Sequence, residues 1–268
     1  MSIRPLDRDL LRRQFREAVP FPFINIDNFL EPAFADEVAA SYPEYSRANQ
    51  LGREFRALNE NLKIQVCEYE KFPEPTKRLS DALASPAFLE DLSYITNIPR
   101  LVWDERLDGG GMHLTASSGL LDVHVDFNRI PARNLFRRLN ILIYLNPRWD
   151  ESWGGLLELW DSQVKQRHHG FVPIHNRCVI FETSEISYHG VTAVRCPPDV
   201  ARKSFAAYYY TREAPATYSG TDHSTIFKAR PDELVKGYLL MPATSLRRAV
   251  SERYQGAKRA IKQLIGRS

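Results

Sequence analysis

Three residues of the types that bind transition metals lie in or next to short apolar runs of the chain. His124 and Asp126 belong to LLDVHVDF (120–127), whose alternating pattern predicts a β-strand. Residues i and i+2 of a strand point to the same face, so this imidazole and carboxylate should project together. His189, shortly after the apolar run VIFET, is a candidate third ligand. Two imidazoles and one carboxylate suit ferrous iron with open coordination positions, an arrangement that activates oxygen.

A cation and a hydroxyl follow these candidate ligands at a spacing that fits a carboxylate-binding site. Arg202 lies 13 residues after His189, at the start of a β-rich run, and Ser204 should share its strand face. A guanidinium group binds a carboxylate through two parallel hydrogen bonds. Metal ligands followed by such a group imply a co-substrate that chelates iron at one end and carries a carboxylate at the other. Lys203, on the opposite strand face, and Arg195 are the alternative cations.

The chain resembles the Fe(II)/2-oxoglutarate-dependent dioxygenases, specifically a bacterial subgroup of their prolyl-4-hydroxylase-like branch. The family motif is H-x-D, a distal histidine and a basic residue after it, matched here by His124, Asp126, His189 and Arg202. Tyr144 in ILIYLN stands where oxygen-sensing prolyl hydroxylases have a tyrosine that hydrogen-bonds the distal carboxylate of 2-oxoglutarate. WGGLLELWD and PFPFINIDNFL add to the likeness, which covers about residues 20–232. The insertion RCPPDVA lengthens the gap before Arg202 relative to many prolyl hydroxylases.

The resemblance implies a mainly β fold with flanking helices, a double-stranded β-helix or jelly-roll like that of the cupins, with the metal in its open mouth. It implies Fe(II), 2-oxoglutarate and O2 as cofactors and co-substrates, with ascorbate as an optional reductant. 2-Oxoglutarate would be decarboxylated to succinate while an unactivated C–H bond is hydroxylated. Asp126 favours hydroxylation, because halogenating relatives have a small residue at that position.

The substrate suggested by this likeness is a prolyl or other amino-acid residue, in a peptide or protein or as the free amino acid. A sugar, a lipid or a natural-product intermediate is an alternative, since substrate pockets are built from variable loops. Two other classes of protein would use the same residues: a jelly-roll binding domain without catalysis, and a cupin-type zinc or manganese enzyme.

Two further polar residues are expected near the cavity. His113 lies upstream of H-x-D, on an expected adjacent strand. It would line the pocket or contact 2-oxoglutarate, or else be a hydrogen-bonded interior histidine. Asn140 alternates with Leu142 and Tyr144, so it would face the pocket if Tyr144 does and bind co-substrate or substrate. Arg138 would share that face further out.

The elements that must position these residues divide the chain into two parts. Residues 1–236 are expected to form a single domain, with a mainly helical support at 1–99 and a catalytic β-core at 100–212 that contains about eight short β-rich runs. The support should contain helices near 6–18, from Pro32 and over 74–97 with a break at Pro86, and a strand within 20–30. Residues 237–268 are expected to form a basic amphipathic helix.

Composition excludes several classes of protein. The 268 residues are 43% hydrophobic and 26% charged, which is ordinary for a globular protein and unlike a disordered chain. No apolar stretch approaches the ~20 residues of a membrane span, and the charged N-terminus lacks the apolar run of a signal peptide. Three widely spaced cysteines argue against disulfides and thiolate zinc sites and favour a cytoplasmic location.

The net charge of +3 is unevenly distributed. Residues 237–268 carry +6, which leaves −3 on residues 1–236, so no nucleic-acid partner is expected for the body. The tail would dock on the body through its apolar stripe. Contact with an anionic membrane surface, or with an acidic substrate or nucleic acid, is the alternative.

Overall fold

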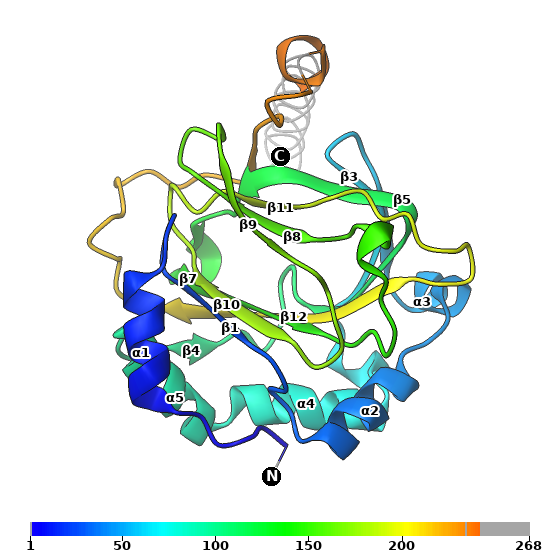
Figure 1. Ribbon diagram of the computed structural model, residues 1–268. Helices are drawn as coiled ribbons and strands as arrows, with labels where there is room; N and C mark the ends of the chain where they lie inside the picture. The colour runs from blue at the N-terminus through cyan, green and yellow to red at the C-terminus, as the bar shows by residue number, and fades with distance from the viewer. Residues whose placement is uncertain (1, 234, 242–268) are drawn as a thin grey trace, which may run out of the picture.

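One antiparallel sheet of thirteen strands curls round until its two layers face each other (Figure 1). The computed structural model describes residues 2–233 and 235–241. The strands are β1 (Phe23–Ile26), β2 (Arg53–Arg56), β3 (Glu60–Val66), β4 (Val102–Trp103), β5 (Gly111–Val125), β6 (Arg129–Ile130), β7 (Leu135–Tyr144), β8 (Leu157–Trp160), β9 (Arg167–Phe171), β10 (Cys178–Glu182), β11 (His189–Val191), β12 (Arg202–Thr211) and β13 (Ile226–Phe227). Their main path of hydrogen-bonded neighbours runs β1-β10-β7-β12-β5-β11-β8-β9. This arrangement confirms the predicted mainly β jelly-roll with flanking helices.

Strand β5 joins the two layers. Its first half pairs with β12 in one layer, where Ser204 lies opposite His113, and its second half pairs with β11 in the other, where His189 lies opposite His124. Ser118, between the two halves, has a left-handed φ of 68° and interrupts the regular strand. The sequence predicted the second half and placed His113 on a separate, adjacent strand, whereas both segments belong to β5.

The helices cover one face of the layer formed by β1, β10, β7 and β12, as Figure 1 shows beneath the sheet. Alternate β7 residues Leu139, Ile141 and Ile143 are fully buried in the same apolar cluster as Leu79 and Leu83 from the helices. The intervening β7 residues therefore point the other way, into the space between the layers. The helices are α1 (Arg8–Glu17), α2 (Pro32–Ser41), α3 (Tyr45–Leu51), α4 (Glu74–Ala84) and α5 (Pro86–Thr96), with short 3-10 turns η1 (Tyr69–Lys71), η2 (Pro131–Arg133) and η3 (Glu151–Trp153).

The helix boundaries agree with the signals in the sequence. Pro32 and Pro86 each stand in the first turn of a helix, where the missing N–H of proline leaves no hydrogen bond unmade. Ser85 ends α4 and caps α5, accepting a hydrogen bond from the backbone N–H of Phe88 at 3.3 Å. The predicted break at Pro86 is thus confirmed.

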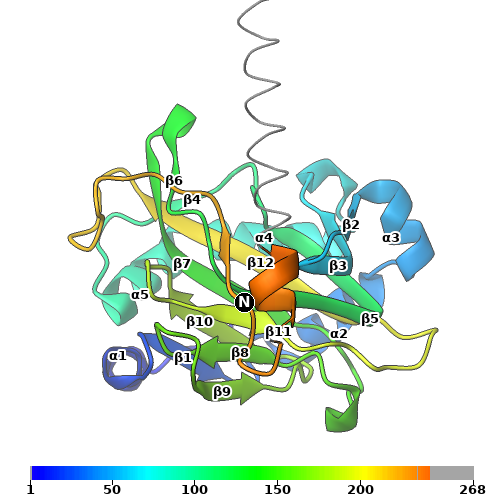
Figure 2. The same cartoon turned by 90° about the horizontal axis from the view of Figure 1, so that it is seen from above.

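A hairpin of β2 and β3 lies within the segment that was predicted to be mainly helical support. It pairs along the edge of β5, and Figure 2 shows it beside β5 and next to α3. The prediction of helices and one leading strand for residues 1–99 was therefore incomplete. The alternation of Ile64 and Val66 with Lys63 and Gln65 is a strand pattern that could have revealed β3.

After β12 the chain returns to the sheet through β13 and ends, among the described residues, in the π-helix η4 (Lys236–Leu240). Arg230 fixes this segment: it forms ion pairs with Glu158 at 2.7 Å and with Asp122 at 3.3 Å. The predicted amphipathic helix 237–268 falls mostly at 242–268, outside the described residues. Within the described part of the chain, no helix is long and apolar enough to cross a bilayer.

Candidate metal centre

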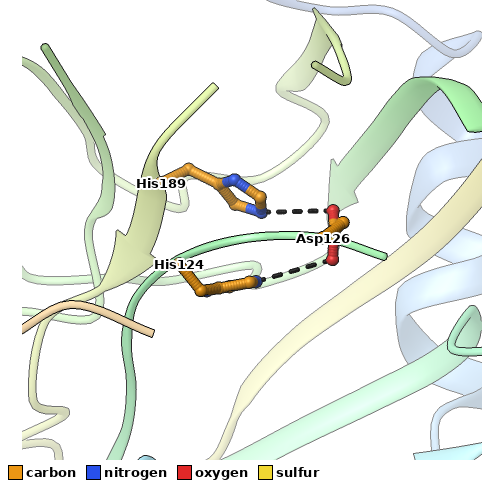
Figure 3. Close-up of side chains that lie close together, drawn as sticks. All are labelled: His124, Asp126 and His189. Atoms are coloured by element: carbon orange, nitrogen blue, oxygen red, sulfur yellow. Dashed lines mark ion pairs between the residues drawn. The ribbon is translucent and has the colours of Figure 1, made fainter. Parts of the chain in front are cut away.

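His124, Asp126 and His189 converge in the space between the two layers (Figure 3). His124 is near the end of β5, Asp126 directly follows that strand, and His189 begins β11, where it pairs with His124. The Nε2 atoms of His124 and His189 each lie 3.6 Å from a carboxylate oxygen of Asp126. One ligand atom from each residue lies within 4.8 Å of the others, which is close enough for one metal ion. The structure thus brings together the three residues that the sequence predicted.

Backbone carbonyl groups fix the tautomer of both histidines. His124 Nδ1 lies 2.8 Å from the carbonyl oxygen of Asp122, and His189 Nδ1 lies 2.9 Å from that of Ser187. A carbonyl oxygen only accepts hydrogen bonds, so each Nδ1 carries a proton and donates it. Each Nε2 therefore presents a lone pair, as a metal-binding imidazole requires. Burial, with repulsion from His124, lowers the pKa of His189 to about 3, so this ring is neutral at physiological pH.

Asp126 is held in its ionised form by neighbouring cations and hydrogen-bond donors. Burial alone would raise its pKa, but Arg137 and the two histidines hold the pKa of Asp126 well below its usual range. Its Oδ2 atom accepts a hydrogen bond from Nδ2 of Asn140 at 2.8 Å and lies 3.2 Å from Nη2 of Arg137. With Oδ2 engaged in this way, Oδ1 is the oxygen left to bind a metal through a single contact.

Arg137 and Asn140 form a buried polar pair behind this carboxylate. Nε and Nη2 of Arg137 donate to Oδ1 of Asn140 at 3.1 and 3.0 Å. The guanidinium carbon lies 3.5 Å from the centroid of the Tyr208 ring and 4.6 Å from that of Phe127. Asn140 was predicted to bind co-substrate or substrate. It does line the cavity, but its side chain is engaged in orienting Asp126.

Arg137, rather than the predicted Arg138, faces the cavity because β7 contains a bulge. β12 pairs Tyr209 with Leu139 but pairs Tyr210 with Arg137, so Arg138 is an extra residue without a partner. The bulge reverses the alternation before Leu139. Arg138 consequently lies 3.7 Å from a carboxylate at the end of β10, away from the cavity. The prediction for Arg138 was therefore wrong, and no local pattern in the sequence indicated the bulge.

The three candidate metal ligands line a cavity of about 470 Å³ that also contains Arg202 and Ser204. Nε of Arg202 donates to the carbonyl oxygen of Gly155 at 2.7 Å, and the guanidinium carbon lies 4.9 Å from the ring centroid of Tyr144. Among the described residues, the buried atoms Nη2 of Arg202, Oη of Tyr144 and Oγ of Ser204 have no hydrogen-bond partner. Buried polar atoms are rarely left unpaired, so three together indicate a site for a ligand with several acceptor oxygens.

Strand register explains why these three side chains meet. Ser204 of β12 pairs with Tyr144 of β7 on one side and with His113 of β5 on the other. Burial raises the pKa of Tyr144 to about 12, so its hydroxyl group keeps its proton and can donate it. Lys203 lies on the opposite face of β12 and does not line the cavity, as the alternation predicted, and Arg195 is exposed.

His113 is buried against the cavity wall. Its Nε2 lies 3.1 Å from the carbonyl oxygen of Gly109, to which it must donate. Burial first, and then the charge of Lys63, place the pKa of His113 well below 6.5, so the ring is neutral. His113 lines the cavity as predicted. Its predicted contact with 2-oxoglutarate stays a prediction.

The depressed pKa of His113 gives an expected dependence of stability on pH. The unfolded chain protonates this residue near pH 6.5 and the folded protein does not, so the unfolded state binds more protons below that pH. The free energy of unfolding of the metal-free protein should therefore fall as the pH drops below 6.5, by up to about 1.4 kcal/mol per pH unit for this group. His113→Asn should reduce that slope in urea titrations between pH 7.5 and 5, and His168→Asn, at an exposed site, should not. Equal slopes for the wild type and His113→Asn would contradict this account.

The hairpin of β2 and β3 contributes cavity-lining residues that the sequence reasoning missed. Arg53, Phe55, Glu60, Lys63 and Gln65 all line the cavity. They were overlooked because no strand was expected in this segment, and a strand is what turns alternate charged residues to one face. Arg137 was missed for the different reason of the β7 bulge.

Comparisons with known proteins agree with this geometry. Residues 110–210 match the sequence model of the 2OG-Fe(II) oxygenase superfamily. A segment of 88 residues is 35% identical to prolyl 3-hydroxylase OGFOD1 of Mus musculus and covers 31% of this chain. The chain spans only 16% of the length of that relative.

Solved structures of prolyl hydroxylases share the fold. A prolyl hydroxylase from Trichoplax adhaerens, in complex with a peptide of hypoxia inducible factor, superposes with a TM-score of 0.54 and 17% identity, over 76% of this chain and 88% of the other. A prolyl-4-hydroxylase from Pseudomonas putida gives a TM-score of 0.52 and 16% identity, over 75% of this chain and 98% of the other. At this identity the likeness concerns the fold. Residues 110–210 are thus similar to the 2OG-Fe(II) oxygenase superfamily, and the fold is like that of the prolyl hydroxylases.

Proposed function

We propose that the protein is an Fe(II)- and 2-oxoglutarate-dependent hydroxylase. The observation that carries the proposal is a single cavity that contains two complementary groups. One is the set of metal-ligand atoms of His124, Asp126 and His189, and the other is the set of unpaired donors around Arg202. A keto acid that binds iron at one end and has a carboxylate at the other needs both.

The donor atoms suit a ferrous ion. Two neutral imidazole nitrogens and one carboxylate oxygen are borderline and hard ligands, and this set with open positions is typical of non-haem iron oxygenases. Asn140 and Arg137 engage Oδ2 of Asp126, which favours binding through Oδ1 alone. Contact through one oxygen leaves more of the coordination sphere to co-substrate and oxygen.

The donors around Arg202 suit a carboxylate. A guanidinium nitrogen, a phenol that keeps its proton and a serine hydroxyl can together satisfy two carboxylate oxygens. In our proposal, Arg202, Tyr144 and Ser204 hold the distal carboxylate of 2-oxoglutarate, and His113 lies beside them.

When bound, ferrous iron and 2-oxoglutarate supply the reduction of O2, coupled to decarboxylation of 2-oxoglutarate to succinate and hydroxylation of a C–H bond. The residues of this chain bind and orient these reactants. Phe127, Tyr208 and Phe227 line the wall near the metal-binding residues and limit the access of water. As expected from the sequence, the carboxylate at position 126 favours hydroxylation.

The proposed substrate is a prolyl or other amino-acid residue, supported by the similarity to prolyl hydroxylases in sequence and fold. A sugar, a lipid or a natural-product intermediate is the alternative. We further propose that residues 1–236 act as one catalytic domain in a reducing cytoplasmic environment. The free thiols of Cys67, Cys178 and Cys196 are consistent with that environment.

The direct test is 2-oxoglutarate consumption by the full-length protein. Succinate should form only when ferrous iron, O2 and 2-oxoglutarate are all present, with ascorbate added to keep the iron reduced. A chelator should abolish succinate formation, and ferrous iron should restore it. If anaerobically reconstituted protein forms no succinate on aeration with a panel of amino acids, peptides and glycans, the non-catalytic binding domain becomes the better assignment. Preferential binding of zinc or manganese in metal analysis after controlled reconstitution, without succinate formation by the iron-loaded protein, would favour the cupin-type metalloenzyme.

A further inference from the structure

The β2–β3 hairpin presents one coherent face to the cavity. Arg53 pairs with Gln65 and Phe55 with Lys63 across the hairpin, so these four side chains share one face, called here the hairpin face. All four line the cavity. The pairing continues from Lys63 through Thr115 of β5 to Arg202 of β12. Lys63 and Arg202 are therefore two strand spacings apart, which puts their backbones roughly 10 Å from each other.

Two cations of the hairpin face flank one aromatic ring. The guanidinium carbon of Arg53 lies 4.7 Å from the centroid of the Phe55 ring, and Nζ of Lys63 lies 5.7 Å from it. Lys63 is also paired with Glu60, at 2.9 Å, and its side chain is only 14% exposed. Arg53 has no carboxylate partner among the described residues, and its ring contact leaves the guanidinium hydrogens available.

The neighbouring arginine of the same strand shows the contrast. Arg56 forms an ion pair with Glu54 at 2.8 Å and does not line the cavity. Arg53 is therefore set apart from a nearby exposed arginine by both its position and its missing partner.

The charges that line the cavity do not balance. Its cationic side chains are Arg53, Lys63, Arg137 and Arg202, and its acidic side chains are Glu60 and Asp126. The formal charges of these side chains therefore leave an excess of two positive charges. Ferrous iron and the 2-oxoglutarate dianion would add opposite charges of equal size and leave this excess unchanged. Positive charge in a partly enclosed cavity raises the local concentration of anions and opposes the entry of cations.

We propose that the substrate is an organic anion whose carboxylate or phosphate group is bound by Arg53 together with Lys63. The ring of Phe55 packs against the adjoining apolar part of the substrate. This inference rests on the proposed function and names the substrate class for the same cavity. Glu60 neutralises part of the charge of Lys63, so Arg53 supplies the main attraction and Glu60 limits its strength.

The test measures binding to the full-length protein loaded anaerobically with ferrous iron and 2-oxoglutarate, so that no turnover occurs. The probes are matched pairs: N-acetyl amino acids with their carboxamides, and sugar phosphates with their free sugars. In thermal-shift and calorimetric titrations, acidic members should bind at least about tenfold more tightly than their neutral partners, as expected for a charge-assisted hydrogen bond. The two series separate a carboxylate from a phosphate as the preferred group.

Three variants test the residues. Arg53→Gln should remove the preference for the acid, and Arg56→Gln, the matched control on the same strand, should keep it. Glu60→Gln should strengthen the binding of the acid, because it frees Lys63. A purely structural role of the hairpin would not produce opposite effects at Arg53 and Glu60. Since Arg53 is exposed, Arg53→Gln removes no buried contact, and its unfolding temperature checks that it folds.

Equal binding of acid and neutral partner, no binding by either member in any pair, or a preference that survives Arg53→Gln would overturn the inference. The proposed function is judged separately by succinate formation in the wild type. Wild-type protein that consumes 2-oxoglutarate without any acid preference would refute the substrate class alone.

Discussion

Asp126→Ala is expected to reduce succinate formation to the background level. The substitution removes the only carboxylate among the three candidate metal ligands and leaves Arg137 buried beside them without its partner. Metal binding should fall with activity, because the two histidines alone retain only two ligand atoms. Titration with Co(II), followed by its visible absorption, measures the binding independently of turnover.

His189→Ala provides a second variant in case an unpaired Arg137 unfolds the first. It removes a neutral ring, so no buried charge is left behind, and it should also reduce turnover to background.

Asn140→Ala should give an intermediate result, because Asn140 orients Asp126 without being a ligand. Loss of such a supporting hydrogen bond typically costs about 10–100-fold in metal affinity or activity. Thr183→Val, which removes a longer contact of 3.4 Å to Asn140, is the matched control and should have little effect. Wild-type turnover in both Asp126→Ala and His189→Ala would refute the site.

Arg202→Ala is expected to raise the apparent KM for 2-oxoglutarate at least about 30-fold. Removing one partner of a buried, hydrogen-bonded charge pair costs roughly 2 kcal/mol or more. Direct calorimetric titration with 2-oxoglutarate under anaerobic conditions, alongside steady-state kinetics, separates binding from turnover. Metal affinity without co-substrate should change little, since Arg202 is not a metal-ligand candidate.

Lys203→Ala is the control for this prediction. Lys203 is the next residue of the same strand, is also cationic and points away from the cavity, so its loss should leave the KM for 2-oxoglutarate unchanged. Tyr144→Phe removes one of the three unpaired donors and should raise the KM by less than Arg202→Ala does. An unchanged KM in Arg202→Ala would refute its assignment to the distal carboxylate.

Part of the candidate metal centre could be predicted from the sequence because that part depends on local rules. The strand alternation that puts His124 and Asp126 on one face acts over two residues, and the same rule separated Arg202 from Lys203. The helix breaks at Pro32 and Pro86 follow equally local preferences. Bringing His189 to His124 required long-range pairing, which only the family resemblance supplied.

The residues that were missed depend on long-range pairing or on irregular backbone. Arg137 enters the cavity in place of Arg138 because a bulge in β7 lies opposite β12, a register that only the folded sheet determines. Arg53 and Lys63 act together because β2 and β3 pair with each other and with the edge of β5. His113 and His124 were expected on separate strands, because no local pattern shows that one strand continues through the irregular backbone at Ser118.

Strand β5 runs through both layers and connects the candidate metal ligands with the strand position opposite Arg202. The proposed enzyme should therefore select keto acids by length. Thr115, in the first half of this strand, pairs with Arg202, and His124, near its C-terminal end, is a metal-ligand candidate. The two groups are thus connected through one strand, whose backbone is irregular at Ser118, and not only through loops. In the proposed enzyme, dicarboxylic keto acids one carbon shorter or longer than 2-oxoglutarate are therefore expected to be poorer co-substrates. The backbone beside Ser118 is tightly packed, because a Cβ atom at Gly119 would lie 2.4 Å from the Thr115 side chain. A larger residue at position 119 should therefore shift this part of β5 and alter the preference for keto-acid length.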